Sequence, residues 1–236
     1  MKIKKFILAM VVLWLLPLSG QGPAPFHSEG AQRLALLLRK LDRTVRLLYV
    51  TAHPDDEDGG LLALLTHGEG VETALLTLTR GEGGQNEIGT QLNHTLGALR
   101  SRELEAAQRY HGARQYFSRA VDFGYSFSVR ETYEKWGERR ILRDLVQVIR
   151  DFRPDVMITL TPFGGGGGQH HQASALLAAK AFEVAGDSHR WPELGPPHTT
   201  RRLFRQIWGD EKPAALCEVS LDRFDPVIGC SYAELG

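Results

Sequence analysis

One histidine and three carboxylates stand together in the stretch AHPDDE, residues 52–57. They follow the apolar run 45–50, which has the composition of a buried strand, where charged groups are costly unless they have partners. His53 and Asp56 are three residues apart, so both side chains can reach one divalent ion from a strand-to-helix turn. Imidazole and carboxylate groups suit Zn²⁺, which in catalytic sites takes three protein ligands and a water molecule. The residue types therefore favour a metal site over a plain turn.

The third ligand of such an ion has to come from another loop. His171 is the natural candidate because it opens a predicted helix at the same edge of the sheet, although spacing alone does not rank it above His170. Asp55 need not bind the metal, and a free carboxylate beside a metal can act as a base.

A helix cap is the competing interpretation of AHPDDE. Asp55 or Asp56 would cap the following helix, and Glu57 would interact favourably with the helix dipole in the first turn. A cap explains each acid singly but does not explain the His-Pro pair before them. The two interpretations are compatible.

Apolar periodicity and turn residues predict strands that alternate with helices. The predicted helices are 27–40, 56–67, 96–111, 131–152 and a last one from the two histidines to about 185, and the predicted strands are 45–51, 71–79, 115–117, 155–160, 201–208 and 214–219. This alternation indicates an α/β fold with a mostly parallel sheet. Right-handed crossovers place the loops after the strands along one edge, where ligands bind in open α/β sheets.

Three unusual polar loops follow predicted strands and so meet at this edge. They are AHPDDE, TRGEGGQNE at 79–87 and GGGGGQHHQ at 164–172. The glycine run 164–168 can cradle an anion at a helix N-terminus or form a wall without side chains beside the metal. It lacks the spacing of a phosphate-binding loop, so we favour the wall.

These loops together resemble those of the PIG-L/LmbE-like zinc-dependent de-N-acetylases. The resemblance is carried by AHPDDE after a buried strand, TRGEGGQ, LGALRSREL at 96–104 and the later histidine that opens a helix, and it covers roughly residues 45–186. It implies a Rossmann-like three-layer sandwich and zinc-dependent removal of an acetyl group from substrates of the N-acetylglucosamine type. The roles that it implies are metal binding by His53, Asp56 and His171, base catalysis by Asp55, and substrate contact by Arg100 and Glu82.

The chain departs from the family pattern at the second histidine motif, which usually reads H-x-D-H. With the last histidine on His171, Gly168 stands where the first histidine belongs and His170 stands where the aspartate belongs. His170 is then the remaining candidate to stabilise the charged intermediate or to protonate the leaving amine, from a different point on the backbone. The ligand types also suit Fe²⁺, so iron is an alternative to zinc.

Composition excludes some classes of protein. The 236 residues include 28 lysines and arginines and 28 aspartates and glutamates, so the net charge is zero and a general nucleic-acid binder is not expected. The chain is long enough for one sizeable domain. Cys217 and Cys230 are too few for a zinc–thiolate site, and they could form a disulfide in an exported protein.

The N-terminus predicts export. MKIKK is followed by about 13 apolar residues and then by small residues, which is typical of a secretory signal peptide, here residues 1–22. An uncleaved anchor is the alternative, but a full membrane span needs about 20 apolar residues. We therefore expect a periplasmic or extracellular α/β domain over 23–236, without stable membrane insertion after cleavage. This domain can be the N-terminal part of a longer protein.

The sequence thus predicts an exported metal-dependent amide hydrolase that acts on an acetylated amino sugar or glycoconjugate. The alternative is a non-catalytic Rossmann-like module that binds a glycan or a nucleotide sugar through the glycine loops and holds no metal.

Overall fold

The computed structural model describes residues 29–84, 86–162, 168–207 and 216–236. The predicted signal peptide and most of the glycine run 164–168 lie outside the described residues. Among the helices that are described, none is both long and apolar enough to cross a membrane.

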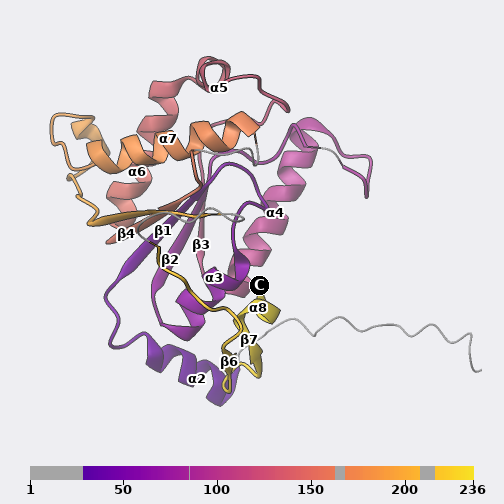
Figure 1. Cartoon of the computed structure of the whole chain (residues 1–236), viewed down its shortest axis with the longest axis vertical. Coiled ribbons are helices and arrows are strands. Elements are labelled where there is room, and N and C mark those ends of the chain that lie inside the picture. The colour runs from indigo at the N-terminus through magenta and orange to yellow at the C-terminus, as the bar shows by residue number, and fades with distance from the viewer. Residues whose placement is uncertain (1–28, 85, 163–167, 208–215) are drawn as a thin grey trace, which may run out of the picture.

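Five strands form one all-parallel sheet in the order β3-β2-β1-β4-β5 (Figure 1). The strands are β1 (Arg46–Thr51), β2 (Glu72–Thr77), β3 (Arg114–Phe117), β4 (Val156–Thr159) and β5 (Arg202–Arg205). From β1 the chain builds outward through β2 to β3, then returns to place β4 on the other side of β1. This reversal makes the space beyond β1 and β4 a topological switch point, where ligands bind in this class of sheet.

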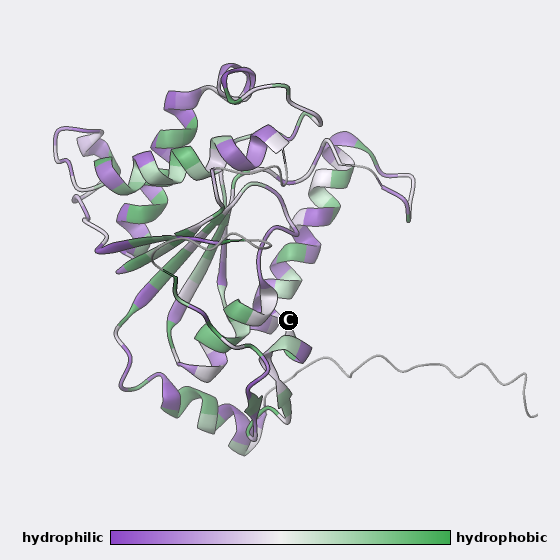
Figure 2. Cartoon of the chain, viewed as in Figure 1, coloured by the Kyte–Doolittle hydropathy of each residue, from purple (hydrophilic) through white to green (hydrophobic). Residues whose placement is uncertain are grey.

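Helices cover both faces of the sheet. One face carries α5 (Val129–Trp136), α6 (Glu138–Phe152) and α7 (Gly168–Val184), and the other carries α3 (Gly59–Ala63), its π-helical continuation η1 (Leu64–Gly68) and α4 (Asn93–His111). Alternate residues of β1 serve the two cores: Leu48 and Val50 pack under α6 and α7, while Leu47 and Tyr49 pack toward α3 and α4. Figure 2 shows the strands as mostly hydrophobic, as a doubly covered sheet requires. The predicted three-layer α/β sandwich is confirmed.

A separate small unit packs at the end of the domain where α2 (Gly30–Arg39) lies (Figure 1). It contains β6 (Phe224–Asp225), β7 (Cys230–Ser231) and α8 (Tyr232–Leu235), which the sequence analysis did not predict. Outside this unit, a 3₁₀ turn η2 (Pro192–Leu194) precedes β5. The buried Asp225 carboxylate accepts hydrogen bonds from Arg39, at 2.9 Å to Oδ1, and from the Tyr232 hydroxyl. These bonds join the end of the described chain to its first helix.

Two of the predicted elements differ in the structure. The helix predicted over 131–152 is two helices, because Gly137 takes a φ of +76°, a left-handed conformation that glycine adopts without strain. The predicted strand 214–219 is not a strand over its described residues 216–219. Cys217 and Cys230 are free thiols in the structure, so the disulfide considered for an exported chain is not formed.

Candidate metal centre

The loop that carries AHPDDE, residues 52–57, folds back on itself through Asp56. Its Oδ2 accepts hydrogen bonds from the backbone amides of Ala52, at 3.1 Å, and His53, at 2.7 Å. Burial alone would raise the pKa of Asp56, but the hydrogen bonds to His171 and His53 outweigh it and hold the pKa far below its ordinary value. Asp56 is therefore a carboxylate at neutral pH, with Oδ1 facing away from the loop.

The cap of the following helix is neither Asp55 nor Asp56. The Asp58 side chain accepts the backbone N–H of Leu61 at 2.9 Å and caps α3. The cap interpretation of the first two aspartates is thus wrong, because neither of their carboxylates caps α3.

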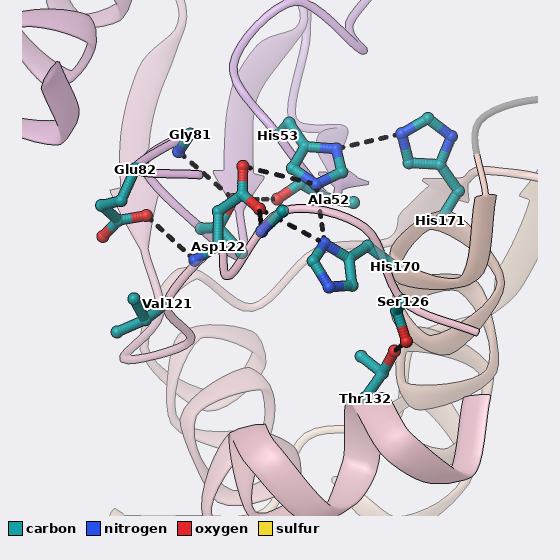
Figure 3. Close-up of polar contacts among 12 residues, drawn as sticks. Ala52, His53, Gly81, Glu82, Val121, Asp122, Ser126, Thr132, His170 and His171 are labelled. Carbon is teal, nitrogen blue, oxygen red and sulfur yellow. Dashed lines mark hydrogen bonds and ion pairs between the residues drawn. The ribbon is translucent and has the colours of Figure 1, made fainter. Parts of the chain in front are cut away.

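The three predicted metal ligands converge, and Figure 3 shows the contact between two of them, His53 and His171. His53 Nδ1 lies 3.0 Å from His171 Nε2, His171 Nε2 lies 2.9 Å from Asp56 Oδ1, and His53 Nδ1 lies 3.5 Å from Asp56 Oδ2. The first loop supplies two of these side chains and the first turn of α7 supplies the third, so the loops after the neighbouring strands β1 and β4 build the group.

This group fits a divalent ion. Zinc binds nitrogen and oxygen ligands at about 2.0–2.2 Å in a tetrahedron, which places neighbouring ligand atoms roughly 3.3 Å apart. The two separations that involve His171 Nε2, 2.9 Å to Asp56 Oδ1 and 3.0 Å to His53 Nδ1, are close to that spacing, and His53 Nδ1 lies 3.5 Å from the other Asp56 oxygen, Oδ2. Two imidazoles and one ionised carboxylate leave a fourth position open, as in catalytic zinc sites.

His53 is held by charge on both sides. Burial lowers its pKa, but the hydrogen bond to Asp56 and the charges of Asp56, Asp122 and Asp55 outweigh this and raise the pKa above its ordinary value. The negative environment that favours a proton on His53 equally favours a metal cation beside it.

A second cluster lies on the other side of the His53 ring. His53 Nε2 is 3.0 Å from His170 Nδ1, and Asp122 carboxylate oxygens lie 3.6 Å from His170 Nδ1 and 4.0 Å from His53 Nε2. These three residues also form a group of ligand atoms close enough to surround an ion. The sequence analysis missed Asp122, because its segment is irregular and carries no motif. Its position after β3, at the same edge of the sheet, was the signal available.

His170 is buried, with 3% of its surface exposed. Its ring meets the edge of Phe123 at 4.4 Å between centroids and lies 5.0 Å from Trp136. Burial, followed by the charge of His53, lowers the pKa of His170 to about 4, so the ring is neutral at neutral pH. Among the described residues, its Nε2 has no hydrogen-bond partner.

Asp55 differs from its neighbour Asp56 in every respect. Its side chain is exposed, and its backbone has a φ of +100°, a strained value for a residue with a Cβ atom. Arg100 Nη2 donates to Asp55 Oδ2 at 2.7 Å and to the Pro54 carbonyl at 2.6 Å, and Asp55 N–H donates to Glu57 Oε2 at 3.1 Å. Arg100, predicted to contact substrate, is thus placed beside the predicted base, which lies outside both groups of converging ligand atoms that the described residues form.

Glu82 is also placed at this edge, but it is buried. Its Oε2 accepts the backbone N–H groups of Arg80, at 3.1 Å, and Asp122, at 3.0 Å. The second loop and the Asp122 segment approach so closely that a Cβ on Gly83 would lie 2.2 Å from the Gly124 nitrogen, which only glycine permits. The substrate contact of Glu82 stays a prediction, and its observed contacts tie the two loops together.

Comparisons with known proteins agree with this fold and site. Residues 48–182, more than half of the chain, match the family model described as PIG-L, GlcNAc-PI de-N-acetylase. The 1D-myo-inositol 2-acetamido-2-deoxy-alpha-D-glucopyranoside deacetylase of Rhodococcus opacus is 32% identical over 194 residues, which cover 74% of this chain and 65% of that relative. The chain therefore spans less than two thirds of the length of this relative.

Two solved structures share the fold at low identity. The N,N'-diacetylchitobiose deacetylase of Pyrococcus horikoshii matches with a TM-score of 0.53 and 20% identity, over 74% of this chain and 68% of that chain. The 4-carboxy-2-hydroxymuconate hydratase GalB of Pseudomonas putida matches with a TM-score of 0.54 and 21% identity, over 68% and 64%. Since the same fold carries a deacetylase and a hydratase, the chemistry has to be judged from the side chains.

Proposed function

Because this chain belongs to the PIG-L family of de-N-acetylases, we propose that it is a metal-dependent amide hydrolase that removes an acetyl group from an N-acetylated amino sugar or glycoconjugate. The observation that carries the proposal is the convergence of His53, Asp56 and His171 at the switch point of the sheet. Two imidazoles and one carboxylate, with a fourth position open, are typical of hydrolytic zinc sites.

Zinc is the proposed ion, with Fe²⁺ as the alternative that the same ligands suit. A bound divalent ion would supply Lewis-acid chemistry, since it acidifies water and polarises a carbonyl group. The two backbone N–H groups on Asp56 Oδ2 fix the carboxylate so that Oδ1 faces His171. The binding position is therefore built before the ion arrives.

Asp55 is the proposed general base. Arg100 holds its Oδ2, which orients the carboxylate and keeps a positive charge beside it. In the proposed reaction Asp55 takes a proton from the attacking water and returns it to the amine as the carbon–nitrogen bond breaks, which yields acetate and a free amino sugar. Its strained backbone supports this role, since strain of this kind is concentrated at functional sites.

The relatives support the proposed substrate class. The name of the Rhodococcus opacus relative describes an acetamido sugar joined to inositol, and we extend only the acetamido sugar to this chain. Arg100 and Glu82 remain the proposed substrate-side residues, and export remains a proposal that rests on residues 1–22 of the sequence.

Metal content tests the proposal first. The chain, expressed without a chelating tag, should hold near one zinc or iron, and His171→Ala should lose it. His189→Ala is the matched control, because His189 is an exposed histidine outside the site and its removal should leave the metal in place. Acetate release from N-acetylated amino sugars would then be measured with the loaded wild type.

Two results would decide against the hydrolase. A folded wild type that takes up no metal even when zinc is offered would overturn the proposal and favour the glycan-binding module. Metal uptake that survives His171→Ala would place the ion elsewhere.

A further inference from the structure

We propose that His170 and Asp122 are positioning residues that act through His53: they hold its Nε2–H from behind, so that Nδ1 faces the metal site. This inference rests on the proposed function, because it needs an ion at His53 Nδ1. It gives His170 a role different from direct proton transfer to the substrate.

The first step is the tautomer of His53. A neutral imidazole carries one proton, so when Nδ1 binds a metal the proton has to be on Nε2. The Nε2 atom lies 3.0 Å from His170 Nδ1, which is hydrogen-bonding distance, and Figure 3 shows His170 and His171 on different sides of the His53 ring. The Nδ1 atom faces Asp56 and His171. The two ring nitrogens of His53 therefore face two different clusters, and a hydrogen bond on one side sets the lone pair on the other.

The second step is the orientation of His170. To accept from His53, its Nδ1 has to be unprotonated, so its own proton is on Nε2, the buried atom without a partner among the described residues. A buried N–H without an acceptor is unfavourable. The packing of the ring against Phe123 and Trp136 holds it in this orientation despite that cost. With 3% of its surface exposed, this ring acts on His53 rather than on a substrate.

The third step is the charge behind the two rings. The Asp122 carboxylate lies 3.6 Å from His170 Nδ1 and 4.0 Å from His53 Nε2, so it favours a proton between them. Asp122 is itself fixed, since its N–H donates to Glu82 and its Oδ1 accepts from Gly124 N–H at 2.8 Å. Metal-binding histidines generally need such a hydrogen-bond partner on the nitrogen that does not bind the metal, because it fixes the tautomer and the ring orientation.

The second cluster, formed by His53, His170 and Asp122 and here named the inner cluster, has the ligand types to hold a second ion instead of a proton. Its imidazole–carboxylate separations of 3.6 and 4.0 Å are wider than the 2.9 and 3.5 Å of the outer group, which is His53, Asp56 and His171, while the two imidazoles are 3.0 Å apart in both groups. The wider spacing favours the proton, and metal stoichiometry separates the two.

The experiment measures metal affinity rather than activity. Zinc affinity would be determined by competition with a chromophoric chelator, and the geometry of the site would be followed by the visible spectrum of the Co²⁺-loaded chain. His170→Phe keeps the ring packing but removes the acceptor, and it should weaken metal binding by about 10- to 100-fold and shift the Co²⁺ bands.

Two further variants keep the inference testable if His170→Phe folds poorly. His170→Asn leaves a side-chain oxygen near the place of Nδ1 and should recover much of the affinity, while Asp122→Asn should weaken binding less than His170→Phe does. His111→Phe is the control: His111 is another buried imidazole, and its Nδ1 has no hydrogen-bond partner within the described part of the chain. Its loss should move neither readout.

The outcomes are distinct from those of the proposed function. A wild type that binds one ion, together with unchanged affinity and spectrum in His170→Phe, overturns this inference alone. A second ion in the wild type that Asp122→Asn removes also overturns it, in favour of an inner metal site. A wild type without any metal overturns the proposed function and this inference together.

Discussion

The two ends of the central sheet arrange their ionisable side chains in opposite ways. At the amino end, charges alternate in sign along the strand order β3-β2-β1-β4-β5, through Arg114, Glu72, Arg46, Asp155 and Arg201. Arg114 and Arg46 lie 3.5 and 3.0 Å from Glu72, Arg201 lies 3.6 Å from Asp155, and Asp155 accepts the Arg46 backbone N–H at 3.1 Å. At the carboxyl end, three imidazoles and two carboxylates crowd together instead.

The difference shows which end the fold keeps for a ligand. The pairs at the amino end are mostly exposed, and pairs of that kind contribute about 0–1 kcal/mol each. The carboxyl end tolerates a strained backbone at Asp55 and, on His170, a buried nitrogen that has no hydrogen-bond partner among the described residues, and both cost stability. Groups held in that state serve binding and catalysis better than they serve the fold.

The largest expected effect is at the carboxyl end. Asp55→Asn keeps the shape of the side chain but removes its basicity, and Asp55 is not among the converging ligands. Turnover should fall by about 10²- to 10⁴-fold while metal content stays the same. Steady-state kinetics on the metal-loaded variant check this, and hydrolysis at the wild-type rate would rule out Asp55 as the base.

The next effect is a pH dependence that only this end should show. Because the pKa of His53 is raised, a proton competes with the metal for Nδ1 over a wider pH range than for an ordinary histidine. Below that pKa the zinc affinity should fall about tenfold per pH unit for each proton displaced. Chelator competition at several pH values measures the slope. An affinity that does not change between about pH 5 and pH 7, where histidines ordinarily titrate, would contradict the prediction.

A smaller effect separates strain from chemistry at Asp55. Glycine adopts a φ of +100° freely and alanine does not, so Asp55→Gly should be more stable than Asp55→Ala by about 1–2 kcal/mol. Both variants lose the contact with Arg100, so that loss cancels in the difference. Urea denaturation of the two variants measures it, and equal stabilities would mean that the backbone there is unstrained.

The smallest effect is at the amino end. Glu72→Gln removes the charge between Arg46 and Arg114 while its shape is kept, and it should cost less than about 1 kcal/mol. Zinc affinity and its pH dependence should not change. A larger loss in urea denaturation would show that the alternating charges act as a network, and the contrast between the two ends would weaken.

The sequence by itself determined the fold class and predicted which loops come together at the site. The alternation of strands and helices predicted the parallel sheet, and the position of AHPDDE and of the histidine pair 170–171 after two strands predicted that they meet, since the carboxyl ends of parallel strands share one edge. The break at Gly137 inside the long predicted helix was missed, because one glycine in a strongly amphipathic pattern does not reveal its φ.

Only the tertiary structure decided what surrounds each of these groups. Asp122, 69 positions beyond His53, approaches its ring because β3 and β1 belong to the same sheet, and no local pattern marks that approach. Likewise Asp55 and Asp56, adjacent and chemically identical, differ because one accepts backbone N–H groups inside the turn while the other meets Arg100 at the surface. Residue type determines which chemistry is available, but burial, charge and hydrogen bonds from distant segments determine which atom performs it.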